Sequence, residues 1–131
     1  MLRYKFTLLL TIVITVLSTI PVPEVPELAD VPFCDKWVHF VMYGALTCAM
    51  WFDKWLNSRK QHKYSYSMAF VIMSFFFPAV WGGLMELAQA YLTTCRSGDW
   101  IDFYADAFGA LLGVLLSLGL WKIIERTSVR K

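Results

Sequence analysis

Four long apolar segments, each almost free of charged residues, divide the chain. They cover about 6–20, 35–52, 64–92 and 101–124. A helix needs about 20 mostly apolar residues to cross the hydrocarbon layer of a membrane, and Pro21 and Pro23 cannot continue the first helix. The pattern therefore predicts an all-α fold, a four-helix transmembrane bundle that forms one integral membrane domain over residues 1–131.

Composition supports a membrane protein. Hydrophobic residues make up 58% of the chain and charged residues 17%, with a mean hydropathy of +0.53, whereas a soluble domain averages about 45–50% apolar residues. The formal net charge of +2 is too small to indicate a nucleic-acid partner. We therefore expect the lipid bilayer to surround the protein, and we expect no nucleic-acid partner.

The basic residues lie mostly on one side of this four-span arrangement. Of the 12 lysines and arginines, all but Lys36 and Arg96 precede the first segment, lie between the second and third, or lie at or beyond the end of the fourth. Because lysine and arginine are retained on the cytoplasmic side of membranes, both termini are predicted to be cytoplasmic. A cleaved signal peptide is the competing interpretation of the first segment, but no small-x-small cleavage site follows it.

Charged and polar residues within and beside the apolar segments gather near the outer end of the predicted bundle. They are Asp35, Lys36, His39, Glu86, Gln89, Arg96, Asp99, Asp102 and Asp106. Charges in a bilayer are costly and usually face the interior of a bundle, and residues three or four apart share a helix face. The spacing therefore predicts an outward-facing polar pocket, with an apolar inner half in every segment.

Gly109 and Gly113 continue the helix face that carries Asp102 and Asp106. Small residues four apart let two helix backbones approach closely. We expect this stripe to be a helix-packing surface, and the sequence leaves open whether it packs within one chain or between two chains of an oligomer.

Two interpretations of the polar residues remain open. In the first, Lys36 and Arg96 neutralise the carboxylates and hold the helices in register, as buried ion pairs can. In the second, the same two cations hold the phosphate or carboxylate of a lipid, since arginine offers a bidentate fork for such groups.

Catalytic and metal-binding motifs are absent from the sequence. No nucleophile or metalloprotease motif occurs, so enzyme activity is uncertain and no catalytic residue is assigned. Zinc needs more nitrogen or sulfur ligands than His39 supplies, and no calcium-loop spacing occurs. We therefore predict neither a metal nor a cofactor. Cys34 and Cys95 both lie on the outer side, where an oxidising compartment would favour a disulfide between them.

Taken in order, these residues resemble the signature of the VanZ-like family of membrane proteins. The matching pieces are Asp35-Lys36-x-x-His39-Phe40, Glu86-x-x-Gln89, Arg96-x-x-Asp99-x-x-Asp102 and Gly109-x-x-x-Gly113, which together cover about 35–113. The resemblance implies a small multi-pass protein of a bacterial-type cytoplasmic (inner) membrane, part of the cell envelope. The best-known relative confers resistance to the glycopeptide antibiotic teicoplanin.

The family's polar signature maps here onto Asp35, Lys36, His39, Glu86, Gln89, Arg96 and Asp102. Where the family usually has asparagine, this chain has Asp106. The added carboxylate changes the charge of the pocket, so neither ligand preference nor antibiotic resistance transfers directly from the family.

The pocket and the resemblance together predict a binding or accessory protein whose pocket takes an anionic lipid headgroup or an envelope precursor. A membrane enzyme that acts on a lipid-linked envelope substrate, with Glu86 or His39 as acid or base, is the alternative. A small transporter is the second alternative, although the polar residues leave no relay across the inner half of the membrane.

Overall fold

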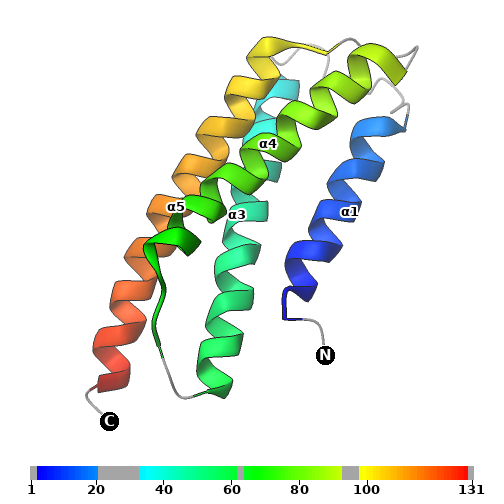
Figure 1. The fold of residues 1–131 in the computed structure, drawn as a ribbon. Helices are drawn as coiled ribbons and strands as arrows, with labels where there is room; N and C mark the ends of the chain where they lie inside the picture. Colours follow the sequence, from blue (N-terminus) through cyan, green and yellow to red (C-terminus); the bar gives the residue numbers. More distant parts are fainter. Residues whose placement is uncertain (1–2, 21–32, 62–63, 93–97, 130–131) are drawn as a thin grey trace.

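The computed structural model describes residues 3–20, 33–61, 64–92 and 98–129, and this part of the chain is helical. It contains the four helices α1 (Lys5–Thr19), α3 (Cys34–Lys60), α4 (Met68–Leu92) and α5 (Trp100–Val129), shown in Figure 1. No strand occurs among the described residues, so the all-α prediction is confirmed for them.

Two of the four helices are long and apolar enough to cross a membrane. They are α4, over Met68–Leu92, and α5, over Trp100–Thr127. α1 is apolar but has only 15 residues, and α3 carries charged residues in its first turn and over its last eight residues. Length and composition thus support membrane crossing for two helices, which is fewer than the four predicted.

Three helix boundaries differ from the predicted segments by four residues or more, and one of them is the end of α5, at Val129 instead of about 124. α3 continues beyond the expected end near Phe52 as far as Lys60, because charged residues end an apolar segment without ending a helix. α4 begins at Met68 instead of Tyr64. Ser67 caps this helix, since its hydroxyl oxygen accepts a hydrogen bond from the Phe70 N–H at 3.2 Å.

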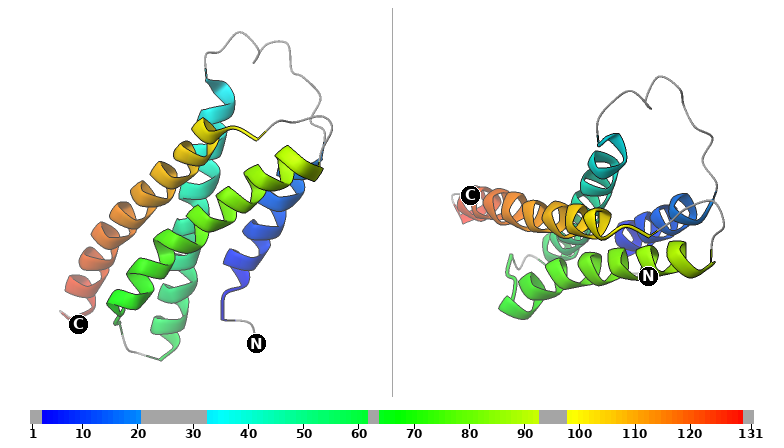
Figure 2. Two further views of the ribbon diagram at one scale, coloured as in Figure 1. Left: turned by 45° about the horizontal axis from the view of Figure 1, so that its top comes forward. Right: turned by 90° about the horizontal axis from the view of Figure 1, so that it is seen from above.

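α3 and α4 each pack against the three other helices of the bundle. Figure 2 shows α3 running alongside α5. The N- and C-termini and the connection from α3 to α4 lie at one end of the bundle in Figure 1. The ends of α1 and α4 and the starts of α3 and α5 lie at the opposite end, which we call the polar end because Lys36, His39 and Asp102 lie there.

Glycines let α3 and α5 pack at close range. A Cβ atom on Gly109 would overlap the backbone carbonyl oxygen of Phe40, and one on Gly113 would lie 2.8 Å from the carbonyl oxygen of Gly44. Both distances are too short for real carbon–oxygen contacts, so only glycine fits at these positions. The predicted Gly-x-x-x-Gly stripe therefore packs against α3 of the same chain.

Asp53 holds the start of α1 against α3. Its Oδ2 accepts hydrogen bonds from both the N–H and the hydroxyl of Thr7, each at 2.8 Å. Asp53 is 1% exposed and lies far from the polar end along α3. Asp53 lies just beyond the predicted end of the second apolar segment, and its buried carboxylate satisfies N–H groups of the first turn of α1.

Two further hydrogen bonds join α1 to α4. The indole N–H of Trp81 donates to the hydroxyl of Thr15 at 3.2 Å. The side-chain amide of Gln89 donates to the backbone carbonyl of Ser18 at 3.1 Å. α1 is thus tied to its neighbours by polar bonds near its start, its middle and its end.

Candidate functional site

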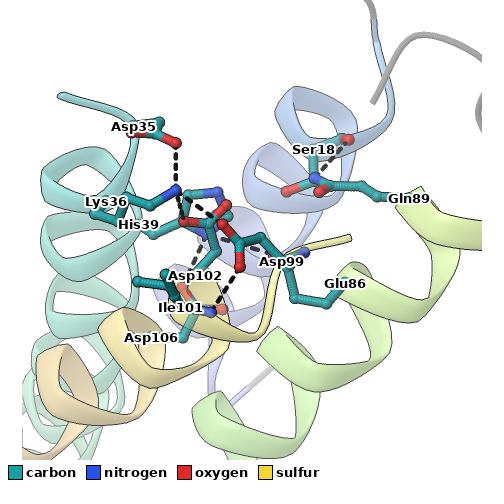
Figure 3. A network of polar contacts seen from close by, with 10 residues as sticks. All are labelled: Ser18, Asp35, Lys36, His39, Glu86, Gln89, Asp99, Ile101, Asp102 and Asp106. Atoms are coloured by element: carbon teal, nitrogen blue, oxygen red, sulfur yellow. Dashed lines mark hydrogen bonds and ion pairs between the residues drawn. The ribbon is translucent and has the colours of Figure 1, made fainter. Parts of the chain in front are cut away.

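Lys36 joins the start of α3 to the start of α5 at the polar end. Its ammonium nitrogen lies 2.6 Å from Asp35 Oδ2, and Figure 3 draws the ion pairs of this lysine. It also lies 3.2 Å from Asp99 Oδ2 and 2.9 Å from Asp102 Oδ1. The Asp35 side chain is 62% exposed and that of Asp102 is 11% exposed, so this ion-pair network leads from the surface to the interior.

His39 lies deeper in the bundle, between two carboxylates from other helices. Its Nδ1 is 2.9 Å from Asp106 Oδ1 on α5 and 3.8 Å from Glu86 Oε1 on α4. All three residues are buried, and Asp106 is 0% exposed. Figure 3 shows these side chains converging from three helices.

Two glycines allow close packing at the polar end: Gly82 of α4 against the side chain of Asp106, and Gly98, just before α5, against the backbone of Glu86. A Cβ atom on Gly82 would lie 2.5 Å from Asp106 Oδ2, and one on Gly98 would overlap the backbone carbonyl oxygen of Glu86. The close passage at Gly98 brings the Asp99 N–H to Glu86 Oε2, to which it donates at 2.8 Å. Gly82 and Gly98 therefore shape the polar end without contributing polar side chains.

The described residues of the polar end are mainly acidic. Its carboxylates are Asp35, Glu86, Asp99, Asp102 and Asp106, and they face one lysine and one histidine. At the surface, the pKa of Asp99 lies below its ordinary value because the Ile101 N–H donates to its carboxylate and the Lys36 ammonium lies against it. An excess of carboxylates makes this end attractive to cations.

Several buried polar atoms of the polar end have no hydrogen-bond partner among the described residues. They include Glu86 Oε1, Asp106 Oδ2 and the hydroxyl of Tyr43. Buried polar atoms are normally paired, and each exception calls for an explanation. The polar end thus has acceptor capacity that the described side chains do not use.

A groove of about 410 Å³ opens beside these carboxylates, between α4 and α5. Its polar lining comes from Glu86 and Asp99. The rest of the lining is apolar or aromatic and includes Leu84, Leu87, Tyr91, Trp100 and Phe103. The groove could not be predicted from the sequence, because its walls come from two helices whose side chains come together only in the folded structure.

The structure brings together most of the predicted site residues. Asp35, Lys36, His39, Glu86, Asp99, Asp102 and Asp106 form one connected set. Gln89, by contrast, is 2% exposed and donates to Ser18 of α1. Arg96 and Cys95 lie outside the described residues, so the lipid-binding role of Arg96 and the disulfide with Cys34 stay predictions.

Tyr43 belongs to the site but was not predicted from the sequence. It is 0% exposed, and its ring stacks on His39 with a centroid distance of 6.4 Å and an interplanar angle of 14°. The signal that could have found it is helical spacing, since Tyr43 follows His39 by four residues and so shares its face.

This arrangement can hold a positively charged or hydrogen-donating group near its carboxylates, and an apolar chain in the adjoining groove. The resemblance to the VanZ-like family stays a prediction from the sequence. The chain matches no protein-family model, no curated protein and no solved structure.

Proposed function

We propose that the protein is a VanZ-like membrane protein of the cell envelope that binds a lipid or a lipid-linked envelope precursor at the polar end. The observation that carries this proposal is the groove between α4 and α5, which is apolar over most of its lining and has Glu86 and Asp99 beside it. Such a site suits a molecule with an apolar chain and a polar head.

The surface of the helices supports a position inside the membrane. Within the apolar windows of α4 and α5, only 28% and 33% of the residues are buried inside the protein. Large apolar side chains are exposed on all four helices, among them Leu9, Val41, Val80 and Leu115. Exposed apolar surface on this scale needs an apolar surrounding, which a bilayer provides.

We further propose that all four helices cross the membrane, with both termini in the cytoplasm. α3 has 27 residues and therefore a length of about 40 Å, which exceeds a hydrocarbon thickness of about 30 Å. α1 measures about 22 Å, and a bilayer accommodates a short span by local thinning. The basic residues of the described chain lie mostly at the end of the bundle opposite the polar end. This distribution favours a cytoplasmic position for the end that is rich in basic residues.

The polar headgroup would lie beside Glu86 and Asp99. Lys36 already contacts three carboxylates, so the described residues favour a head with hydrogen-bond donors such as hydroxyl or amino groups. Lipid-linked envelope precursors with sugar or peptide heads belong to this class. For an anionic headgroup, Arg96 is the cation that we expect to make the contact.

Native mass spectrometry of protein purified in mild detergent tests the proposal. We expect wild-type protein to retain a lipid adduct, which fragmentation then identifies. Leu87 lines the groove and is 52% exposed, so Leu87→Trp fills the groove without disturbing the interior and removes the adduct. Leu115→Trp places the same substitution on an exposed position of α5 outside this groove and serves as the matched control.

The outcomes separate binding from general lipid association. Loss of the adduct in Leu87→Trp but not in Leu115→Trp, at equal thermal stability, supports the groove. Equal retention in both variants, or wild-type protein without any adduct, contradicts the proposal. Glu86→Gln and Arg96→Ala then test which residues hold the headgroup, since the first changes a polar residue of the groove lining and the second removes the cation predicted from the sequence.

A further inference from the structure

We propose that His39, Glu86 and Asp102 bind one divalent transition-metal ion inside the bundle, in the class of Mn²⁺ and Zn²⁺. One ligand atom from each of these residues lies within 4.8 Å of the other two. The three residues come from α3, α4 and α5 and are 7%, 8% and 8% exposed. A small shift of the side chains would bring these atoms to the spacing of ligands around one ion.

The unpaired oxygen of Glu86 is independent support for a bound ion. Glu86 Oε1 is buried and accepts no hydrogen bond from the described residues, yet it lies 3.8 Å from His39 Nδ1. A buried carboxylate oxygen without a partner loses its solvation without compensation. A cation beside His39 would supply that missing interaction.

The charge of the surroundings also favours a cation. Lys36 contacts Asp102 Oδ1 at 2.9 Å, but it approaches from the surface side and also serves Asp35 and Asp99. The inner carboxylates Glu86 and Asp106 have no described contact with Lys36. A divalent ion carries two positive charges and would balance the carboxylates of Glu86 and Asp106, whereas the imidazole of His39 carries at most one positive charge.

Asp106 orients the histidine. Its Oδ1 lies 2.9 Å from His39 Nδ1, the ring nitrogen that faces Glu86 Oε1 at 3.8 Å. An ion bound at Nδ1 would take the place of this hydrogen bond and would have Asp106 beside it as a further oxygen donor. Asp106 itself is held in a space that Gly82 leaves open. The ring of His39 therefore has a fixed orientation before any ion enters.

The mixture of ligands selects the class of metal. Imidazole nitrogen favours zinc and other transition metals, whereas carboxylate oxygens also suit manganese. Calcium prefers six to eight oxygen ligands and magnesium retains several water molecules, which the buried position of this group disfavours. The set of one nitrogen and two or more oxygens therefore fits Mn²⁺ or Zn²⁺ better than either alkaline-earth ion.

Metal titration of the full-length protein tests the site. Protein without a histidine tag is treated with chelator, exchanged into chelator-free buffer and titrated with Mn²⁺, while electron paramagnetic resonance measures the free ion. We expect one ion per chain, and competition by Zn²⁺ but not by Mg²⁺. His39→Gln and Glu86→Gln are expected to weaken binding by about 10- to 100-fold or more.

Two carboxylate variants are the controls. Asp53→Asn changes a buried carboxylate at the other end of α3, and Asp35→Asn changes an exposed member of the Lys36 network, so both should bind Mn²⁺ with wild-type affinity. Equal weakening in Asp35→Asn and Glu86→Gln would overturn the site, as would a folded wild-type protein that shows no saturable binding.

Spectroscopy of the wild type keeps the test valid even where a variant fails to fold. Electron spin echo modulation of bound Mn²⁺ should show coupling to one imidazole nitrogen. The chain has 2 histidines, so the coupling should persist in His62→Gln. Its absence in the wild type, or its loss in His62→Gln, contradicts ligation by His39. Leu87→Trp should leave metal binding unchanged, which makes failure of the metal site distinguishable from failure of the lipid groove.

Discussion

Gly109 of α5 lies directly against the main chain of Phe40 in α3, so closely that a single methyl group would overlap the Phe40 carbonyl oxygen. This contact sets the distance between the two helices that carry Lys36, His39, Asp102 and Asp106. The geometry of the polar end therefore depends on a residue that has no side chain.

Gly109→Ala should force α3 and α5 apart. Overpacking of this kind typically costs about 1–3 kcal/mol, which lowers the free energy of unfolding measured by dodecyl sulfate titration in detergent micelles. Gly119→Ala is the control on the same helix, because a Cβ atom there meets nothing within 4 Å. If both variants unfold at the same dodecyl sulfate concentration, the close contact at Gly109 does not limit stability.

Asp53→Asn should loosen α1. The substitution removes a charged acceptor of two hydrogen bonds from Thr7, and the loss of a buried bond to a charged group costs about 1–3 kcal/mol. A double-mutant cycle with Thr7→Val measures the coupling between the two side chains. Thr19→Val is the control, since the Thr19 hydroxyl bonds only to backbone carbonyls within α1; additive effects of Asp53→Asn and Thr7→Val would contradict the contact.

Lys36→Met should destabilise the polar end more than Lys36→Arg, because arginine keeps the positive charge. The pKa of Asp99 is lowered in the folded protein by the Ile101 N–H and by Lys36. The stabilisation is therefore present above the unfolded pKa of Asp99 and is lost as the pH falls through its lower folded pKa. Thermal unfolding should show a difference between wild type and Lys36→Met that is full at pH 7 and shrinks below about pH 4.

Cysteine labelling should place the two ends of the bundle on opposite sides of the membrane. In a chain whose native cysteines are replaced by serine, Gln61→Cys should react with an impermeant thiol reagent only after the cells are permeabilised. Leu92→Cys, at the polar end and 83% exposed in the wild type, should react in intact cells. The reverse pattern would invert the proposed orientation, and labelling of both positions in intact cells would exclude it.

The helical class and much of the polar set could be predicted because both depend on spacing within one helix. Asp35 and His39 share a face through the geometry of α3 alone, and the same holds for Asp102, Asp106 and Gly109 on α5. Gln89 has a contact that this spacing alone does not predict. It shares a face with Glu86 within α4, but α1 lies against that part of the helix, and the side chain bonds to Ser18.

Contacts between helices could not be predicted from one sequence. From the sequence, Asp53 is only the charged residue at which an apolar segment ends. In the structure its carboxylate is buried against Thr7. His39, Glu86 and Asp102 were predicted to share a polar pocket, but not to lie as close together as metal ligands, because they are far apart in the chain and form no local motif. Only the crossing of α3, α4 and α5 places them together.

The three polar bonds of α1 have a consequence for the biosynthesis of the protein. Their partners Asp53, Trp81 and Gln89 follow the bonded residues of α1 by 46, 66 and 71 positions. The ribosome therefore completes α1 long before any of these partners exists. We expect α1 to complete its docking only after α3 and α4 have been made, with the bonds to residues of α4 as its last contacts to form.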